Sequence, residues 1–206
     1  MKKFTTTLLL AIGLLVGFTV NAQAVSAATL TQTNSGYWYD RAKADGSDHH
    51  SWHFTLYEVD GQVAYCIQPN IPEGTHYNQG SWEDTGLPNS IKERLLLIGY
   101  YGYTYPGHQT LQFRAATQGL IWDTIVGSGA NTTFHTARWA KGDTFDVSNE
   151  KAQIENLIAH HYDRPSFNGG VFKAQVGETI TLTDTNNVLS NYSVSVSGAD
   201  YSIDGN

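Results

Sequence analysis

Cys66 is the first candidate for a reactive residue, because it is the only cysteine in the 206-residue chain. Four interpretations are open for a single cysteine: an inert core thiol, a disulfide to another chain, a hydrolase nucleophile, or one end of an internal thioester. A nucleophilic cysteine needs a depressed pKa, usually from a helix N-terminus or a histidine. No histidine is close to Cys66 in sequence, so a base such as His108 or His135 would have to approach through the fold.

The first 27 residues have the form of a secretory leader. Lys2 and Lys3 precede an apolar run from Leu8 to Val20, and small residues follow where a peptidase could cut. We therefore assign residues 1–27 to a signal peptide and expect a secreted protein without membrane insertion. A single cysteine is unusual in an exported protein, which favours a chemical role for Cys66.

Charge excludes some partners. Removing the leader takes the formal net charge from −7 to −9, and no Lys/Arg cluster offers the concentrated positive charge that nucleic acid or an anionic membrane requires. The mature length suits one domain with a small appendage. We place the domain at residues 28–169, and interpret residues 170–206 as the truncated start of a following β-rich domain or a linker.

The residues around Cys66 are predicted to form a β-hairpin. Apolar and polar residues alternate from 52 to 57, which predicts a strand with one apolar face. A turn at 58–61 returns the chain as a second strand, 62–67, which carries Cys66. A short aromatic strand is expected at 37–40. The alternating apolar residues are Trp52, Phe54 and Leu56.

Helical spacing follows the hairpin. The first helix is predicted over 89–99, where Ser90 and Glu93 are arranged as a capping box. The second runs from about 110 to 126 and has Gln118 at its middle, and the third begins at Ser148 and continues towards Pro165. Strands followed by helices predict an α+β fold.

Strand-like alternation returns after Gly169. Three strands are expected, at 171–176, 179–182 and 192–196. They are too few to bury a core by themselves, so we interpret them as the start of a β-sandwich module.

Three motifs together resemble the thioester domains of Gram-positive surface adhesins. They are the aromatic-Cys-aliphatic stretch Tyr65-Cys66-Ile67, the helix followed by Gly99-Tyr100-Tyr101-Gly102-Tyr103, and the stretch Thr117-Gln118-Gly119-Leu120-Ile121-Trp122. The resemblance covers residues 37–164. It implies a fold with a β-sheet or barrel part and a small helical part.

The resemblance also implies a reaction. The Cys66 thiol would attack the Gln118 carboxamide, ammonia would leave, and a thioester would remain, shielded from water by Tyr65 and Trp122. A nucleophile on a host protein, a lysine amine in the family, would then attack it and join the two proteins covalently. The module would act once, without turnover and without a cofactor, so it would not be an enzyme in the usual sense.

The implied context is a virulence-associated surface protein that is secreted and anchored to the cell wall. Its partners would be a host extracellular or cell-surface protein and the following β-domains of its own chain, in which Lys173 could form an isopeptide bond. Two other classes remain open: a secreted cysteine hydrolase with Cys66 as nucleophile, and a non-covalent binding module that uses the aromatic loop 100–105.

One position departs from the family pattern. Gly119 stands where a larger residue is expected, and a glycine inside a helix costs about 1 kcal/mol relative to alanine. Either it lets the Cys66 strand approach closely, or the helix starts later than predicted.

Other clusters predict no metal site. His49, His50 and His53 lack an acidic or sulfur ligand at a suitable spacing and are interpreted as a solvated strand edge. The stretch 184–187 resembles part of a calcium loop but lacks the later glutamate, so an Asx turn is expected. His108 and His135 are interpreted as surface or loop residues.

Overall fold

The computed structural model describes residues 28–69 and 85–204. The predicted signal peptide therefore lies outside the described residues. The described residues divide into two compact units, one ending at Ile158 and the other beginning at Ala159. Within the described residues, no helix combines the length and the apolar character needed to cross a membrane.

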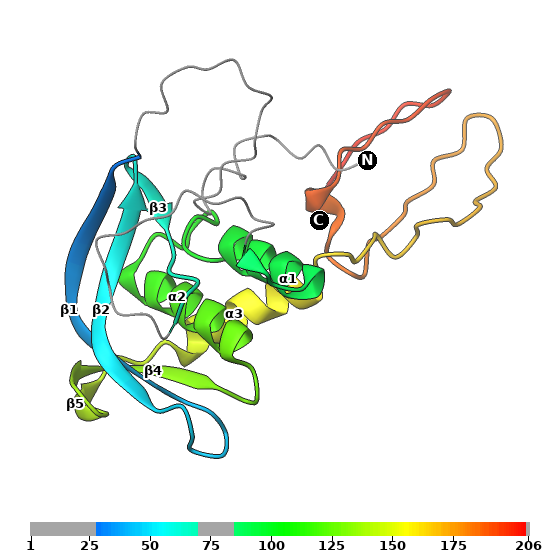
Figure 1. The fold of residues 1–206 in the computed structure, drawn as a ribbon. Coiled ribbons are helices and arrows are strands. Elements are labelled where there is room, and N and C mark those ends of the chain that lie inside the picture. The colour runs from blue at the N-terminus through cyan, green and yellow to red at the C-terminus, as the bar shows by residue number, and fades with distance from the viewer. Residues whose placement is uncertain (1–27, 70–84, 205–206) are drawn as a thin grey trace. The chain divides into compact units, whose positions relative to one another are not determined.

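A five-stranded antiparallel sheet forms one layer of the first unit (Figure 1). Its strands lie in the order β3-β2-β1-β4-β5. The central strand β1 pairs with β2 on one side and with β4 on the other. The strands are β1 (Leu30–Ala42), β2 (His50–Val59), β3 (Gln62–Ala64), β4 (Asn131–Ala137) and β5 (Lys141–Thr144).

Three helices lie together on one side of this sheet (Figure 1): α1 (Asn89–Tyr101), α2 (Leu111–Val126) and α3 (Ser148–Ala159). The predicted α+β fold is thus confirmed. The start of α2 is also as predicted, because the Thr110 hydroxyl accepts a hydrogen bond from the Phe113 N–H and so caps the helix.

The capping residues predicted for the start of α1 were wrong. The helix begins at Asn89 after Pro88, and no side chain caps it, so the expected capping box of Ser90 and Glu93 is not formed. The helix also continues past Gly99 to Tyr101. Gly99 is buried there, where packing offsets the poor helical propensity of glycine.

The core lies between the sheet and α2. Every residue of α2 from Phe113 to Trp122 is buried, so this helix is the central element of the unit. Phe54 of β2 and Phe134 of β4 face it from the sheet, with ring centroids 4.9 Å apart and both side chains almost fully buried. Gln118 therefore sits in the most enclosed helix of the fold.

The strand predictions were correct in position and incomplete in extent. The expected strand at 37–40 lies in the second half of the longer β1. The strands β4 and β5 were not predicted, because their sequences are polar and lack clear alternation. Trp52 was expected on the apolar face of its strand, but its side chain is 47% exposed.

In the second unit, the strands expected between 171 and 196 are not formed within residues 170–204, whose only regular element is a short 3-10 helix, Leu189–Asn191. Strands without partners and without a core are not stable alone. Asp184 holds together the backbone around it in this unit. Its carboxylate accepts hydrogen bonds from four backbone N–H groups, those of Ser166, Asn186, Val188 and Leu189. The bond from Asn186 is the predicted Asx turn.

Candidate functional site

Cys66 lies just beyond the end of β3. The strand was predicted to continue through residue 67, but it ends at Ala64, and Tyr65–Gln68 run on without strand pairing. The backbone groups of this segment are therefore available to contacts other than a sheet ladder. The thiol of Cys66 contacts the carbonyl oxygen of Gln68 at 3.5 Å.

The Gln118 side chain forms two hydrogen bonds with the backbone of Cys66. Its Oε1 accepts a hydrogen bond from the Cys66 N–H at 2.9 Å, and its Nε2 donates to the Cys66 carbonyl oxygen, also at 2.9 Å. The Gln118 side chain is 2% exposed, and a buried carboxamide requires such partners. The structure thus brings together the two residues that the sequence analysis paired, across 52 positions of sequence.

This two-point contact has a chemical consequence. The carboxamide lies alongside the N–Cα–C unit of Cys66, and the side chain that carries Sγ branches from the Cα between the two hydrogen bonds. The Cys66 N–H polarises the Gln118 carbonyl and can stabilise negative charge that develops on Oε1. The arrangement therefore supplies the Gln118 carboxamide as an electrophile, the Cys66 thiol as a nucleophile and the Cys66 N–H as a fixed donor to an oxyanion.

Arg114 fastens the Cys66 segment to α2 one helical turn before Gln118. Its guanidinium donates hydrogen bonds to the carbonyl oxygens of Tyr57 and Ala64, which hold the end of β2 and the end of β3. It also lies over the rings of Tyr65 and Tyr103, 5.0 and 5.2 Å from their centroids. Burial lowers the pKa of Arg114, and the tyrosines oppose that shift.

Tyr65 lies under Arg114 with its hydroxyl buried. Burial raises the pKa of Tyr65 to about 12, although the charge of Arg114 and the hydroxyl of Thr117 act in the opposite direction. Tyr65 therefore stays neutral at physiological pH and forms an apolar wall next to Cys66.

Thr117 and Gly102 make a second close approach beside Gln118. The Thr117 hydroxyl donates to the Phe113 carbonyl at 2.6 Å and accepts from the Tyr103 N–H at 3.1 Å. A Cβ placed on Gly102 would lie 2.3 Å from that hydroxyl. Only glycine at this position lets the end of α1 meet α2.

Trp122 lies one turn beyond Gln118 on α2. Its side chain is 4% exposed and packs against Tyr39 of β1, with ring centroids 4.4 Å apart. Residues four apart share a helix face, so Trp122 and Gln118 lie on the same side of α2. Its indole nitrogen is buried without a hydrogen-bond partner in the described part of the chain.

Gly119 does not serve either purpose that the sequence suggested. The helix begins well before it, and a Cβ there would lie 3.1 Å from Lys151 Cε and 3.4 Å from the Phe134 ring rather than against the Cys66 segment. The glycine instead makes room for Lys151, whose ammonium pairs with Asp123 at 2.8 Å and donates to the Thr132 carbonyl oxygen. This contact holds α3 against α2 behind the site.

The two histidines considered as bases are both buried. His108 lies in the loop between α1 and α2, as predicted, whereas the surface or loop position predicted for His135 was wrong. His108 stacks on Phe113 at 3.6 Å, and its Nδ1 is 2.9 Å from the Tyr101 carbonyl oxygen. His135 lies in β4, with Nε2 3.0 Å from the Thr133 hydroxyl. These contacts give both residues structural roles.

The described residues contain no group of His, Cys, Asp or Glu side chains that could hold a metal ion. Near the predicted strand edge, His49 pairs with Asp40 and His50 pairs with Asp48, while His53 packs against Trp38.

The sequence analysis quoted Gly102, Tyr103 and Thr117 within its motifs but predicted no role for them, and it predicted no role for Arg114. One signal for Arg114 was present in the sequence: it is the only charged residue among the apolar and small residues from Leu111 to Ile121. A charge in such a helix implies an internal partner, since Arg is almost never fully buried unless paired.

Comparison with known proteins gives one match. A family model described as "Thioester domain" matches residues 63–163, a range that includes Cys66, Gln118 and all three helices. No curated protein and no solved structure matches the chain.

Proposed function

The chain belongs to the thioester domain family through residues 63–163, and on that premise we propose that it is a covalent adhesion module whose Cys66 and Gln118 form an internal thioester. The observation that carries the proposal is the pair of hydrogen bonds between the Gln118 carboxamide and the Cys66 backbone. Neither a cysteine hydrolase nor a non-covalent binding module gives Gln118 a reason for this arrangement.

The hydrogen bonds of Gln118 support the following route to the bond. The Cys66 sulfur attacks Gln118 Cδ, and the negative charge that develops on Oε1 is held by the Cys66 N–H. The C–N bond then breaks, and ammonia leaves with the proton that the thiol has lost. The product is a thioester between Sγ and Cδ, with Oε1 as its carbonyl oxygen.

The thioester is an activated acyl group that must be kept from water. Gln118 is almost inaccessible, and we propose that Tyr65, next to Cys66 in the chain, and Trp122, one helical turn from Gln118, provide the apolar surface that shields the bond. The partly exposed Cys66 side supplies the route of approach for a second reactant.

We propose that the second reactant is an amine, a lysine side chain of a host extracellular or cell-surface protein. The amine nitrogen bonds to Gln118 Cδ, the C–S bond breaks, and the sulfur takes the amine proton to regenerate the Cys66 thiol. An amide then links the two proteins. Since the acyl group is consumed, each molecule acts once and the reaction does not turn over.

The proposed setting is the surface of a Gram-positive bacterium. Support comes from the leader-like residues 1–27 and from the resemblance stated above. In this setting the protein is secreted, is anchored to the cell wall, and contributes to virulence by attaching the cell to its host.

The deciding experiment is the intact mass of the purified mature protein, with Cys66→Ala and Gln118→Ala as site variants. The control is Gln109→Ala, because Gln109 is an exposed glutamine just before the same helix. The wild type and the control should each lack one ammonia, and both site variants should show their full sequence masses.

Methylamine should convert the wild-type mass deficit into a methylamide on Gln118, found by peptide mapping. Glutamate at position 118 would show that the bond had formed and then hydrolysed, which also supports the proposal. A full-mass wild type that retains glutamine at 118 and a titratable Cys66 thiol would refute it.

A further inference from the structure

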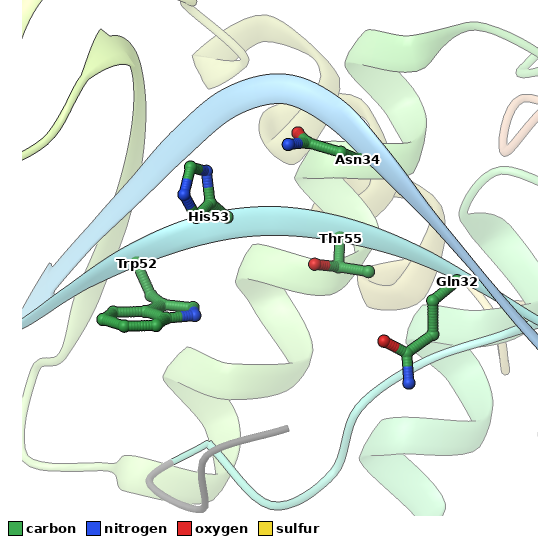
Figure 2. Close-up of a pocket in the computed structure, with 5 residues that line it drawn as sticks. All are labelled: Gln32, Asn34, Trp52, His53 and Thr55. Atoms are coloured by element: carbon green, nitrogen blue, oxygen red, sulfur yellow. The ribbon is translucent and has the colours of Figure 1, made fainter. Parts of the chain in front are cut away.

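A hollow of about 270 Å³ lies over β1 and β2 (Figure 2), away from the residues proposed to form the thioester. Figure 2 shows Trp52 and Gln32 at its two ends with Thr55 between them, and His53 and Asn34 alongside. We propose that this hollow binds a single neutral sugar unit of a glycan, a function distinct from the thioester chemistry.

Strand geometry assembles the polar part of the hollow. Asn34 pairs directly with Thr55 across β1 and β2. Gln32 and His53 each lie two residues from one of this pair, and side chains two apart share a sheet face. These four side chains therefore project to the face opposite Phe54, which is buried in the core. Trp52 lies two residues from Phe54 and so starts from the core face, but its exposed indole lines one end of the hollow, beyond the part of β2 that pairs with β3.

The chemistry of the lining favours a neutral, hydroxyl-rich ligand. Gln32, Asn34, Thr55 and His53 offer amide, hydroxyl and imidazole groups, which both donate and accept hydrogen bonds. Among the described residues, no carboxylate, ammonium or guanidinium lines the hollow. An uncharged set of mixed donors and acceptors matches sugar hydroxyls and gives no charge complement to an anionic ligand.

Trp52 supplies the apolar surface that a sugar ring also requires. Its side chain is 47% exposed, which is unusual for so large an aromatic residue in a strand that otherwise packs on a core. An exposed indole can stack on the C–H face of a sugar ring, as exposed aromatic side chains stack on other planar ligands.

The indole is also held in place. Arg138 lies 5.0 Å from the Trp52 ring centroid, and its Nε donates to the Ser51 carbonyl oxygen at 2.9 Å. Arg138 therefore braces Trp52 from outside the hollow. A fixed aromatic surface loses little conformational freedom when a ligand binds.

The size sets the extent of the ligand. Small-molecule sites usually enclose roughly 300–1,000 Å³, whereas this hollow is slightly smaller and largely open to solvent. One sugar ring fits that space, and the rest of a glycan would extend into solvent.

The experiment is saturation-transfer NMR on the Cys66→Ala protein with four probes, the methyl glycosides of glucose, galactose, mannose and N-acetylglucosamine. The Cys66→Ala background separates this test from the thioester, so either proposal can fail without the other. We expect saturation transfer to at least one probe. The methyl glycoside of sialic acid, which is anionic, is expected to show none.

Trp52→Ala and Trp139→Ala form a matched pair, because both indoles are close to half exposed and both contact Arg138, but only Trp52 lines the hollow. Trp52→Ala should weaken binding about tenfold or more, as expected for loss of an aromatic anchor, and Trp139→Ala should change it less than about twofold. Thr55→Val, which keeps the side-chain shape, should also weaken binding.

Three results would overturn the inference. They are the absence of saturation transfer to all four neutral glycosides, equal losses in the two tryptophan variants, and preferential binding of the sialic acid glycoside.

Discussion

Replacing Arg114 by methionine tests whether this residue holds the Cys66 segment on α2. The guanidinium donates to the carbonyl oxygens of Tyr57 and Ala64 and lies over the rings of Tyr65 and Tyr103. Methionine fills much of the same volume but donates no hydrogen bond. The substitution therefore leaves two backbone acceptors without this donor, on the strands that lead to Cys66.

The size of the effect can be bounded. A hydrogen bond from a charged group contributes about 1.5–3 kcal/mol, and an acceptor left buried without a partner costs a similar amount. Against this, methionine removes a guanidinium whose burial is unfavourable, as the lowered pKa of Arg114 indicates. We expect a net loss of about 3 kcal/mol in the free energy of unfolding.

The matched control is Arg94→Met. Arg94 of α1 pairs with Glu155 of α3, and the two side chains are 35% and 39% exposed, so its loss should cost at most about 1 kcal/mol. Urea unfolding in the Cys66→Ala background, followed by tryptophan fluorescence, measures both variants. In the protein that retains Cys66, intact mass should show that Arg114→Met forms less thioester than Arg94→Met.

Equal unfolding free energies for the two variants, or equal thioester fractions, would refute the assigned role of Arg114. A loss of stability without a loss of thioester would show that Arg114 supports the fold but does not position Cys66.

Two further predictions concern the same region. Gly102→Ala places a Cβ 2.3 Å from the Thr117 hydroxyl oxygen and 2.7 Å from the Ile98 carbonyl oxygen, and should cost about 1–3 kcal/mol by overpacking; thermal unfolding measures this, and an unchanged midpoint would contradict it. Tyr65 has a pKa raised to about 12 by burial, above its unfolded value of about 10. Its contribution to stability is therefore complete below pH 10 and is lost as the pH rises through 12. Between these pH values the Cys66→Ala protein should lose more unfolding free energy than the Tyr65→Phe, Cys66→Ala protein, and parallel pH curves would refute this.

The sequence pattern predicted correctly those parts of the fold that depend on residues close together in the chain. The hairpin of β2 and β3, the start of α2 near residue 110 and the central place of Gln118 in that helix all follow from the spacing of apolar residues. The early end of β3 does not, because it is set by Arg114 and Gln118, which contact it from about 50 residues away. The polar strands β4 and β5 were missed for a similar reason, since they are strands only through pairing with β1 and with each other.

The hydrogen bonds of Gln118 also indicate how the proposed reaction would distinguish its second reactant. Formation of the thioester removes Nε2, so the Cys66 N–H keeps its acceptor while the Cys66 carbonyl oxygen loses its donor. The position that ammonia leaves is the position from which an amine must attack, because aminolysis passes through the same kind of tetrahedral intermediate in reverse. A primary amine can occupy that position, direct its lone pair at Cδ and donate an N–H to the Cys66 carbonyl oxygen, which restores the bond that was lost. A tertiary amine has no N–H to donate and no proton to give to the departing sulfur. We therefore expect the proposed thioester to react with primary amines, such as a lysine side chain, and not with tertiary amines.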